Sequence, residues 1–468
     1  MSTMDVVSST QHKVIELNSD PMTYGSFAEI GAGQEVARWF FQVGGAARTV
    51  AKTISAYDMG VSDSLYGPTQ RYVSRHRLEA MLEHEFAQLR ESLGPKRGAT
   101  STFFAFADTV ATRRRGHDEK GRGWIGVYFQ AKPLEEPSKI IVHAHLLDNS
   151  SVAEQAALGI LGVNLIHGAF FRRDNLAQLI DSLMNDLSRE RVEIDMLKVS
   201  GPAFAGVDNR LLTLQLVEHS LTDAAMFTAA GEVVQPSEVL YDRPILVERG
   251  SFRPATKLTM DLLGLARARF SDEPEVRGLE PVVLAEMTLH NLTVNDRVGA
   301  EDFLARADVL HALGIDVLVS RFQPFYQLAD YLAAYSDRLI GLALGLPTMR
   351  DLLDEQYYEK LDGGALESIG RLFKRSVKMY VYPTRDPVSG EVVTVREATA
   401  LGPAHYLRDF LMEIGRLEAL SGYEPTYLSI HTPDVLARLQ AGDSSWEALV
   451  PPVVAECIKT SKLFGYRG

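Results

Sequence analysis

The sequence predicts an α/β protein, α+β overall, in which an N-terminal mixed domain with an antiparallel sheet precedes a C-terminal portion with a Rossmann-like βαβ unit. Aromatic and β-branched runs at 101–107, 124–130 and 140–147 are joined by polar loops too short for crossover helices, so we expect antiparallel neighbours. Between residues 301 and 358, runs of strand length alternate with helical patterns, which is typical of βαβ units. The acidic, Pro- and Gly-rich stretch 271–281 separates the two patterns and is the best linker candidate.

Length and charge narrow the function classes. The chain has 468 residues, too many for one core, which stops growing at about 250–300 residues, so we expect domains at 1–270 and 282–468. With 48 Lys+Arg and 61 Asp+Glu, the net charge of −13 argues against nucleic-acid or anionic-membrane partners. The single cysteine, Cys457, excludes an internal disulfide and a thiolate metal cluster. A homo-oligomer is compatible with the sequence.

The sequence also predicts a cytoplasmic protein. The first twenty residues lack the basic start and apolar run of a signal peptide. No run of about 18 apolar residues that could span a membrane is visible.

In the N-terminal part, apolar residues recur at helical spacing, and the predicted helices alternate with strands. Residues 22–30 make a poor strand, because Pro21 precedes them and Gly25 lies within. Ser151 can cap the helix that follows the antiparallel strands, and Gly94-Pro95 is a helix stop. The predicted helices are 34–41, 75–93, one from 151 and 175–187, and the further strands are 192–199, 211–217 and 245–247.

In the C-terminal part, the first predicted helix stops at Gly314, and Pro347 stands where proline opens a helix. The predicted helices are 301–313, 325–335 and 348–358, the strands are 315–320 and 338–346, and a last helix within 446–468 precedes a basic tail.

The strongest candidate site is Ser320-Arg321-Phe322-Gln323-Pro324-Phe325, where a buried strand meets a turn and a helix start. Ligands of open α/β sheets bind beyond the carboxyl ends of strands, and Arg321 would clamp a phosphate there. Arg249 and Arg253, around another turn, could supply a second anion contact. The alternatives are an Arg321 paired with Asp316 or Asp337, and a surface turn at 249–254. The candidate ligand-binding residues are Arg249, Arg253, Ser320, Arg321, Gln323 and Phe325.

The same hexamer resembles the Gly-Arg-Phe-Gln-Pro-Phe-His opening of nicotinamide- or nicotinate-nucleotide adenylyltransferases. The resemblance implies a nucleotidyltransferase with a Rossmann-like core, ATP, magnesium and release of pyrophosphate. Ser320 replaces the glycine, and Tyr326-Gln327-Leu328-Ala329 holds neither histidine of the family's His-x-Gly-His motif. Of the family's second motif, roughly Ser-x-Thr-x-x-Arg, only a faint echo stands at 429–433.

From Tyr24 onward, the chain also resembles a bacterial family of uncharacterised proteins. Its members carry inconsistent labels, including nicotinate-nucleotide adenylyltransferase and TonB-dependent receptor. The receptor label conflicts with a sequence in which no signal peptide is visible.

Two further groups lie in the N-terminal part. Gly31-Ala32-Gly33 precedes a helix, but a lone Gly-x-Gly is weak, so it either shapes a loop or binds an anion. His143 and His145 share one face of a predicted strand. With His167 or Asp108 they could hold a metal, or they form a pair with satisfied hydrogen bonds.

The leading hypothesis is a nucleotide- or phosphometabolite-binding protein. Its concrete enzyme form is adenylyl transfer from ATP, with magnesium, to a nicotinate-type mononucleotide. The alternatives are a non-catalytic metabolite-binding or assembly protein, or a different enzyme with its site in the first 270 residues. That last site would draw on Glu29, Gln34, Lys52, Asp58, Asp108 and Arg249.

Overall fold

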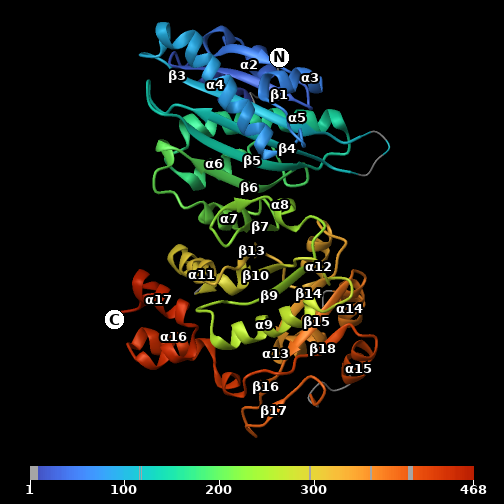
Figure 1. Cartoon of the computed structure of the whole chain (residues 1–468). Helices are drawn as coiled ribbons and strands as arrows, with labels where there is room; N and C mark the ends of the chain where they lie inside the picture. The colour runs from blue at the N-terminus through green and yellow to red at the C-terminus, as the bar shows by residue number, and fades with distance from the viewer. Residues whose placement is uncertain are drawn as a thin grey trace, which may run out of the picture. The chain divides into compact units, whose positions relative to one another are not determined.

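The computed structural model describes residues 9–114, 116, 119–294, 297–358, 361–398 and 404–467 (Figure 1). The chain forms two compact units, unit 1 (Met1–Thr222) and unit 2 (Asp223–Gly468). Each unit has its own sheet and its own hydrophobic core, so the fold is α/β with parallel and mixed sheets. Arg115 of the basic loop and the first eight residues lie outside the described parts.

Unit 1 is built on a mixed six-stranded sheet in the order β2-β1-β3-β4-β5-β6. Strand β1, next to the edge strand β2, runs parallel to both β2 and β3, and each strand from β3 to β6 pairs antiparallel with the next. The antiparallel pairing of the three predicted strands is therefore confirmed. The strands are β1 (Thr23–Ile30), β2 (Val50–Ile54), β3 (Thr102–Ala111), β4 (Gly121–Phe129), β5 (Ser138–Leu146) and β6 (Val192–Ser200).

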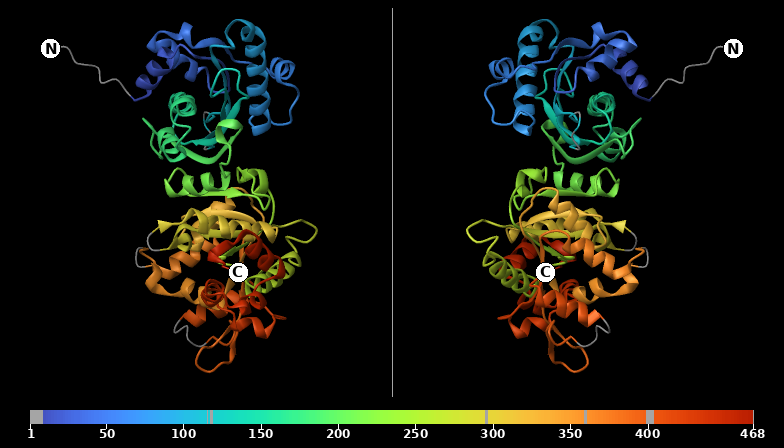
Figure 2. Two further views of the ribbon diagram at one scale, coloured as in Figure 1. Left: turned by 90° about the vertical axis from the view of Figure 1, so that its left-hand side faces the viewer. Right: turned by 90° about the vertical axis from the view of Figure 1, so that its right-hand side faces the viewer.

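Helices cover both faces of this sheet. On one face α4 (Arg75–Arg97) packs against β1, β3 and β4, and the opposite face carries the main core of unit 1 (Figure 2). The helices that bury residues in that core are α1 (Ser9–Ser19), α2 (Glu35–Val43), α5 (Ser151–Phe171), α6 (Leu176–Leu183) and α7 (Asn209–Glu218). The short helix α3 (Met59–Tyr66) packs against α4.

Residues 23–30 form a fully paired strand, so the expectation of a poor strand was wrong. A Cβ at Gly25 would lie 2.4 Å from the Phe104 ring, so only glycine lets these neighbouring strands accommodate that ring. Gly31 follows with φ 104°, and its Cβ would lie 1.8 Å from the carbonyl oxygen of Val110. Glycine is thus required at both ends of the strand for packing.

Three local predictions in unit 1 differ from the structure. Residues 211–217 lie in α7 rather than in a strand, and Asp208 caps that helix through the Arg210 N–H. Helix α4 continues through Pro95 to Arg97 instead of stopping at Gly94. The N-cap of α5 is Ser150, whose hydroxyl accepts from the Ala153 N–H. The side chain that caps the first N–H groups fixes where α5 and α7 begin, and hydrophobic periodicity alone does not identify that side chain.

Unit 2 contains an eight-stranded sheet in the order β18-β15-β14-β9-β10-β13-β7-β8. The six strands from β18 to β13 are parallel, and β7 pairs antiparallel with β13. Read from β13 to β18, the parallel strands follow the order 3-2-1-4-5-6 of a doubly wound sheet, which confirms the Rossmann-like expectation. The strands are β7 (Ala224–Phe227), β8 (Val233–Val234), β9 (Ile245–Arg249), β10 (Val282–Thr288), β13 (Asp316–Ser320), β14 (Ile340–Gly345), β15 (Val377–Tyr382) and β18 (Leu417–Ala419).

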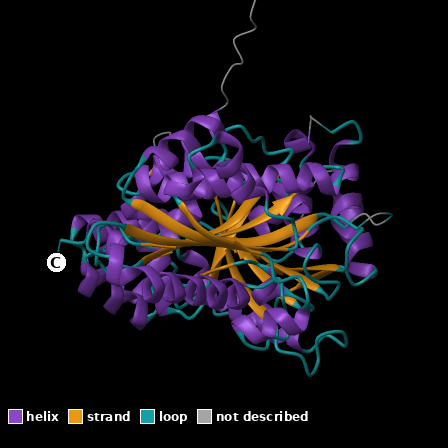
Figure 3. Cartoon of the chain, turned by 90° about the horizontal axis from the view of Figure 1, so that it is seen from above, coloured by secondary structure: helices purple, strands orange, loops and turns teal. Residues whose placement is uncertain are grey.

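Helices lie on both sides of the strands (Figure 3). On one face of the unit 2 sheet, the core draws on α12 (Phe325–Ala333), α13 (Leu346–Leu353), α14 (Gly364–Phe373) and α15 (His405–Glu413). On the other face lie α9 (Lys257–Ser271), whose Phe270 ring approaches Gly341, and α11 (Ala300–Ala312), whose Phe303 ring contacts Phe227. The remaining α-helices of the described part of unit 2 are α8 (Ser237–Leu240), α10 (Leu289–Leu292), α16 (Thr432–Ala441) and α17 (Pro452–Ser461). Two short antiparallel ribbons pair β11 (Thr293–Val294) with β12 (Arg297–Val298) and β16 (Thr384–Arg385) with β17 (Val392–Val393).

The division of the chain falls before the predicted linker. Residues 271–281 connect α9 to β10 inside unit 2, and β9 pairs with β10 in one sheet. The composition of 271–281 is that of an exposed loop between a helix and a strand, because such loops have the same Pro, Gly and acidic content as linkers between domains. Among the described helices, none has the length and apolar character needed to cross a bilayer.

Candidate ligand-binding site

A cavity of about 660 Å³ lies at the carboxyl ends of β9, β10 and β13, the edge where doubly wound sheets bind ligands. Arg249 ends β9, Thr288 ends β10, and Arg321 follows β13. Residues of α13 complete the wall, so the cavity borders the point between β9 and β14 where the strand order reverses. The lining residues are Arg249, Thr288, Leu289, His290, Asn291, Thr293, Arg321, Phe322, Gln323, Pro324, Phe325, Thr348, Asp351, Leu352 and Tyr358.

A buried ion pair forms the floor. Arg249 donates to both carboxylate oxygens of Glu286, over 2.7 Å from Nε and 3.0 Å from Nη2. The Ser320 hydroxyl donates to Glu286 Oε1 over 2.6 Å. Glu286 is fully buried and the Arg249 side chain is 11% exposed, so this pair is screened little by water. Ser320 therefore supports the carboxylate beneath the cavity and does not line it.

Arg249 also fixes the loop after β13. Its Nη1 donates to the Gln323 carbonyl oxygen over 2.6 Å, and its guanidinium lies 4.2 Å from the centre of the Phe325 ring. The charge is compensated by Glu286, so Arg249 acts mainly as a positioning residue for the 321–325 loop. The two predicted segments meet here, although 74 residues separate Arg249 from Gln323.

Arg321 is the more available cation. Its side chain is 41% exposed, and its Nε lies 4.0 Å from a carboxylate oxygen of Asp223, at the limit of an ion pair. Its backbone N–H donates to the Asp223 carbonyl oxygen over 3.0 Å, which holds the start of the loop against β7. Asp316, one of the expected partners, accepts from the Ala229 N–H. An anion in the cavity would compete with Asp223 for the Arg321 guanidinium.

Arg253 does not line the cavity, so its predicted role as a direct anion contact is corrected. Its Nε donates to Asp302 Oδ1 over 2.6 Å. The other oxygen of Asp302 binds Arg306, whose Nη1 donates to the carbonyl oxygens of Ser251 and Asn291 over 3.1 and 2.7 Å. The turn after β9 directs Arg253 toward α11, and this network braces two walls of the cavity.

Sequence reasoning missed the wall contributed by α10 and its flanks. His290 is exposed there, and Thr288, Asn291 and Thr293 add hydroxyl and amide groups to the lining. No helix or strand is predicted from the sequence between residues 282 and 300, where the structure has β10. The run Val282-Val283-Leu284-Ala285 was the signal that could have revealed it.

The lining combines two kinds of surface. Aromatic faces come from Phe322, Phe325 and Tyr358, and burial raises the pKa of the Tyr358 hydroxyl, which stays neutral and donates to the Leu352 carbonyl oxygen over 2.9 Å. Pro324 stands at the N-cap of α12 and has no side-chain oxygen to bind the first N–H groups of that helix. Aromatic planes, hydroxyls and a guanidinium suit a planar ring that carries a phosphate.

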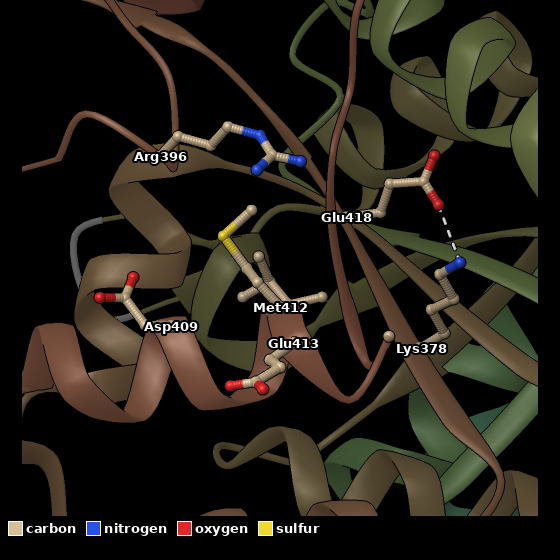
Figure 4. Close-up of a pocket in the computed structure, with 8 residues that line it drawn as sticks. Lys378, Arg396, Asp409, Met412, Glu413 and Glu418 are labelled. Carbon is tan, nitrogen blue, oxygen red and sulfur yellow. Dashed lines mark ion pairs between the residues drawn. The ribbon is translucent and has the colours of Figure 1, made fainter.

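Two other hollows of unit 2 differ in chemistry. One of about 790 Å³ adjoins the cavity and shares with it Arg321, Phe322, Gln323, Pro324 and Tyr358. The other, about 510 Å³, lies beside α15 and β18 (Figure 4). Its Lys378 is held by Glu273 over 2.5 Å and by Glu418 over 2.8 Å, so that cation is already neutralised. Three carboxylates, Asp409, Glu413 and Glu418, outnumber Lys378 and Arg396 in this lining, so it is net acidic and less suited to phosphate.

The helix start that follows Gly31-Ala32-Gly33 in unit 1 already binds a carboxyl group of the chain, that of Glu29. Glu29, fully buried at the end of β1, accepts from the Val36 and Ala37 N–H groups at the start of α2, over 2.9 and 3.0 Å. Burial raises the pKa of Glu29 to about 7. Its cross-strand neighbour Asp108 is also fully buried, and burial and the charge of Glu29 hold its pKa well above the usual range. The helix start is therefore occupied by an internal carboxylate.

The wider N-terminal set does not converge on one site. Lys52 pairs with the buried Glu85 over 2.5 Å, and Asp58 caps α3 by accepting from the Val61 N–H. Arg249 belongs to unit 2. Glu29 and Asp108 face each other across β1 and β3, and Gln34 stands at the N-cap of α2, the helix whose first N–H groups donate to Glu29.

Neither protein-family models nor curated proteins match this chain. Among solved structures, it is similar to the competence/damage-inducible protein CihA from Agrobacterium tumefaciens, at 17% identity and a TM-score of 0.26 over 36% of this chain and 97% of that one. The competence or damage-inducible protein from Enterobacter asburiae is 10% identical, with a TM-score of 0.25 over 35% of this chain and 98% of that one. A competence-damaged protein (CinA) superfamily protein from Escherichia coli is 13% identical, with a TM-score of 0.24 over 36% of this chain and 91% of that one. Similarity at this level leaves the function to be argued from the residues of the site.

Proposed function

We propose that unit 2 binds a nucleotide or another phosphorylated small metabolite in the cavity at the ends of β9, β10 and β13. The observation that carries the proposal is the position of Arg321: an exposed guanidinium follows a central parallel strand and shares a cavity with aromatic and hydroxyl side chains. Arg321 contacts the phosphate, and Phe325, held by Arg249, offers a ring face to the base. The same site without turnover would serve a metabolite-binding or assembly protein.

A thermal-shift panel tests binding directly. We expect Mg-ATP, nicotinate mononucleotide, nicotinamide mononucleotide or NAD to raise the melting temperature of the wild type. At about 100 times its Kd, a ligand adds about 2.7 kcal/mol, or roughly 5–10 °C for a domain of this size. The shift should vanish in Arg321→Ala and persist in Arg338→Ala, which removes an equally exposed arginine paired with Asp242 away from the cavity. No shift with any of the four ligands, or equal shifts in both variants, would contradict the proposal.

The concrete enzymatic form is adenylyl transfer to a nicotinate-type mononucleotide. A phosphate oxygen of the mononucleotide attacks the α-phosphorus of ATP, the new P–O bond forms, and pyrophosphate leaves, so the substrate supplies the nucleophile. The protein then has to position both substrates and stabilise charge. Magnesium neutralises the triphosphate, and Asp351 is the lining carboxylate suited to such a hard cation. His290 favours this form, because it brings an imidazole to the cavity that holds Arg321.

Pyrophosphate release from ATP and nicotinate mononucleotide separates a transferase from a binder. If His290 stabilises the transferred group, His290→Ala should lower kcat about 10²–10³-fold with a smaller change in KM. His431→Ala is the matched control, since that exposed histidine stands at the start of α16 and does not line the cavity. A kcat unchanged in His290→Ala would exclude this role, and nucleotide binding without any release of pyrophosphate would favour the non-catalytic form.

A further inference from the structure

Two histidines on β5 and a carboxylate on β6 meet on one face of the unit 1 sheet. His143 Nδ1 lies 2.6 Å from Asp195 Oδ1, and His145 Nε2 lies 3.1 Å from Asp195 Oδ2. One nitrogen from each histidine and one oxygen of the aspartate all lie within 4.8 Å of one another. Ligand atoms around one tetrahedral cation lie about 3.3–3.6 Å apart, because each is about 2.0–2.2 Å from the metal, so small side-chain rotations would bring these three atoms onto one ion.

A β-bulge brings Asp195 to the histidines. His143 pairs with Met196 and Ala144 pairs with Ile194, which leaves Asp195 as the extra residue of β6. On β6 the core-facing positions change from even to odd residue numbers across this point, so Asp195 projects from the face opposite the core. Bulges re-aim side chains in this way and are common next to functional sites. Local spacing on β5 therefore could not reveal the third ligand.

The residues first considered as partners lie elsewhere. His167 Nε2 donates to Glu16 Oε2 over 2.8 Å, and its ring stacks on Phe171. Asp108 faces Glu29 across β1 and β3. Asp195, and neither of these two possible third ligands, lies beside His143 and His145, and it satisfies the hydrogen bonds of both histidines.

The surroundings hold two ligands firmly and open the third to solvent. His143 and Asp195 are each 2% exposed, whereas the His145 side chain is 25% exposed. The Trp124 ring lies 4.8 Å from the His143 ring, centre to centre, and shields it on one side. A cation could enter past His145 and keep a water on that side.

We propose that His143, His145 and Asp195 bind one divalent transition-metal cation of the Zn²⁺ class, with water as the fourth ligand. Two imidazole nitrogens and one carboxylate oxygen form a borderline donor set that favours Zn²⁺, Co²⁺ or Ni²⁺ over Mg²⁺, which prefers oxygen alone. The cation replaces the two His–Asp hydrogen bonds, and any proton carried by the histidines is released to solvent. The site belongs to unit 1 and stands independently of the nucleotide proposal.

Titration of the chelator-stripped full chain tests the site. We expect one equivalent of Zn²⁺ in calorimetry, and one equivalent of Co²⁺ with the visible absorption of a four-coordinate ion. His145→Ala should weaken binding at least tenfold and abolish that absorption, and it removes the partly exposed ligand. His219→Ala is the matched control, because His219 also pairs with a carboxylate, Asp181, over 2.5 Å in the same unit, but in a cluster of only two.

Thermal unfolding of the metal-free proteins shows whether His145→Ala is folded, and Asp195→Asn provides a second variant that keeps the side-chain shape. Retained Zn²⁺ affinity in His219→Ala, together with weakened binding in His145→Ala and Asp195→Asn, supports the site. Equal affinity in wild type and His145→Ala, absence of Zn²⁺ and Co²⁺ binding to the wild type, or a preference for Mg²⁺ would overturn it.

Discussion

The two units bury carboxylates in different ways. In unit 2, Glu286 at the end of a parallel strand is matched by Arg249 and Ser320, and the groups beyond it open into a cavity. In unit 1, Glu29 and Asp108 face each other across β1 and β3, and neither forms an ion pair with a residue that the structure describes, whereas Asp195 is held by two histidines from the next strand. Parallel strand ends thus gather side chains at one edge, whereas the unit 1 clusters depend on pairing between strands.

The largest difference should appear when the unit 2 carboxylate is removed. Glu286→Ala leaves Arg249 buried without its partner, and breaking a buried pair costs about 3–5 kcal/mol. Denaturant unfolding of the variant should show this loss in unit 2, while Arg338→Ala, an exposed pair, should cost about 0–1 kcal/mol. If Glu286→Ala lowered the free energy of unfolding no more than Arg338→Ala does, the buried pair beneath the cavity would not stabilise unit 2.

The pH dependence of unit 1 should follow its buried carboxylates. The raised pKa of Glu29, about 7, means that the folded state binds a proton more tightly than the unfolded state, so this stability is complete below about pH 4 and is lost as the pH rises toward 7. We expect the free energy of unfolding of unit 1 to fall as the pH rises over that range.

Asp108→Asn should flatten this profile, because it removes a second buried carboxyl group whose pKa is held well above its usual range by burial and by the charge of Glu29, and it keeps Oδ1 as the acceptor for the Ile30 N–H. Urea unfolding at a series of pH values, followed by the fluorescence of Trp39 and Trp124 in unit 1, measures the effect. An unchanged slope in Asp108→Asn would show that the two carboxyl groups are not coupled.

The smallest effect is expected at Arg253. Its side chain is 27% exposed and bound to Asp302, so Arg253→Ala should cost about 1 kcal/mol or less. Because it lies outside the cavity lining, nucleotide affinity should change less than twofold in a calorimetric titration. A loss of affinity as large as that of Arg321→Ala would restore Arg253 as a direct ligand contact.

The difference between strand-end sites and cross-strand clusters explains which site residues could be predicted from the sequence. The rule that ligands bind beyond strand ends led to Arg321, Gln323 and Phe325, and the two arginines around a turn led to Arg249; all four residues line one cavity. His290 was missed because it lies on a four-residue helix with no periodic pattern. Asp195 was missed because a bulge reversed the alternation of β6, and a bulge leaves no local mark in composition.

Amide hydrogen exchange with and without Mg-ATP tests the central claim, that the ligand site of this chain lies at the strand ends of unit 2, most directly. Binding there should slow exchange in the loop after β13 and in α10, with little change at the start of α2 in unit 1. Arg321→Ala should abolish this protection and Arg338→Ala should retain it. Protection confined to the Gly31–Val36 loop and α2, or none in either unit at saturating nucleotide, would contradict the claim.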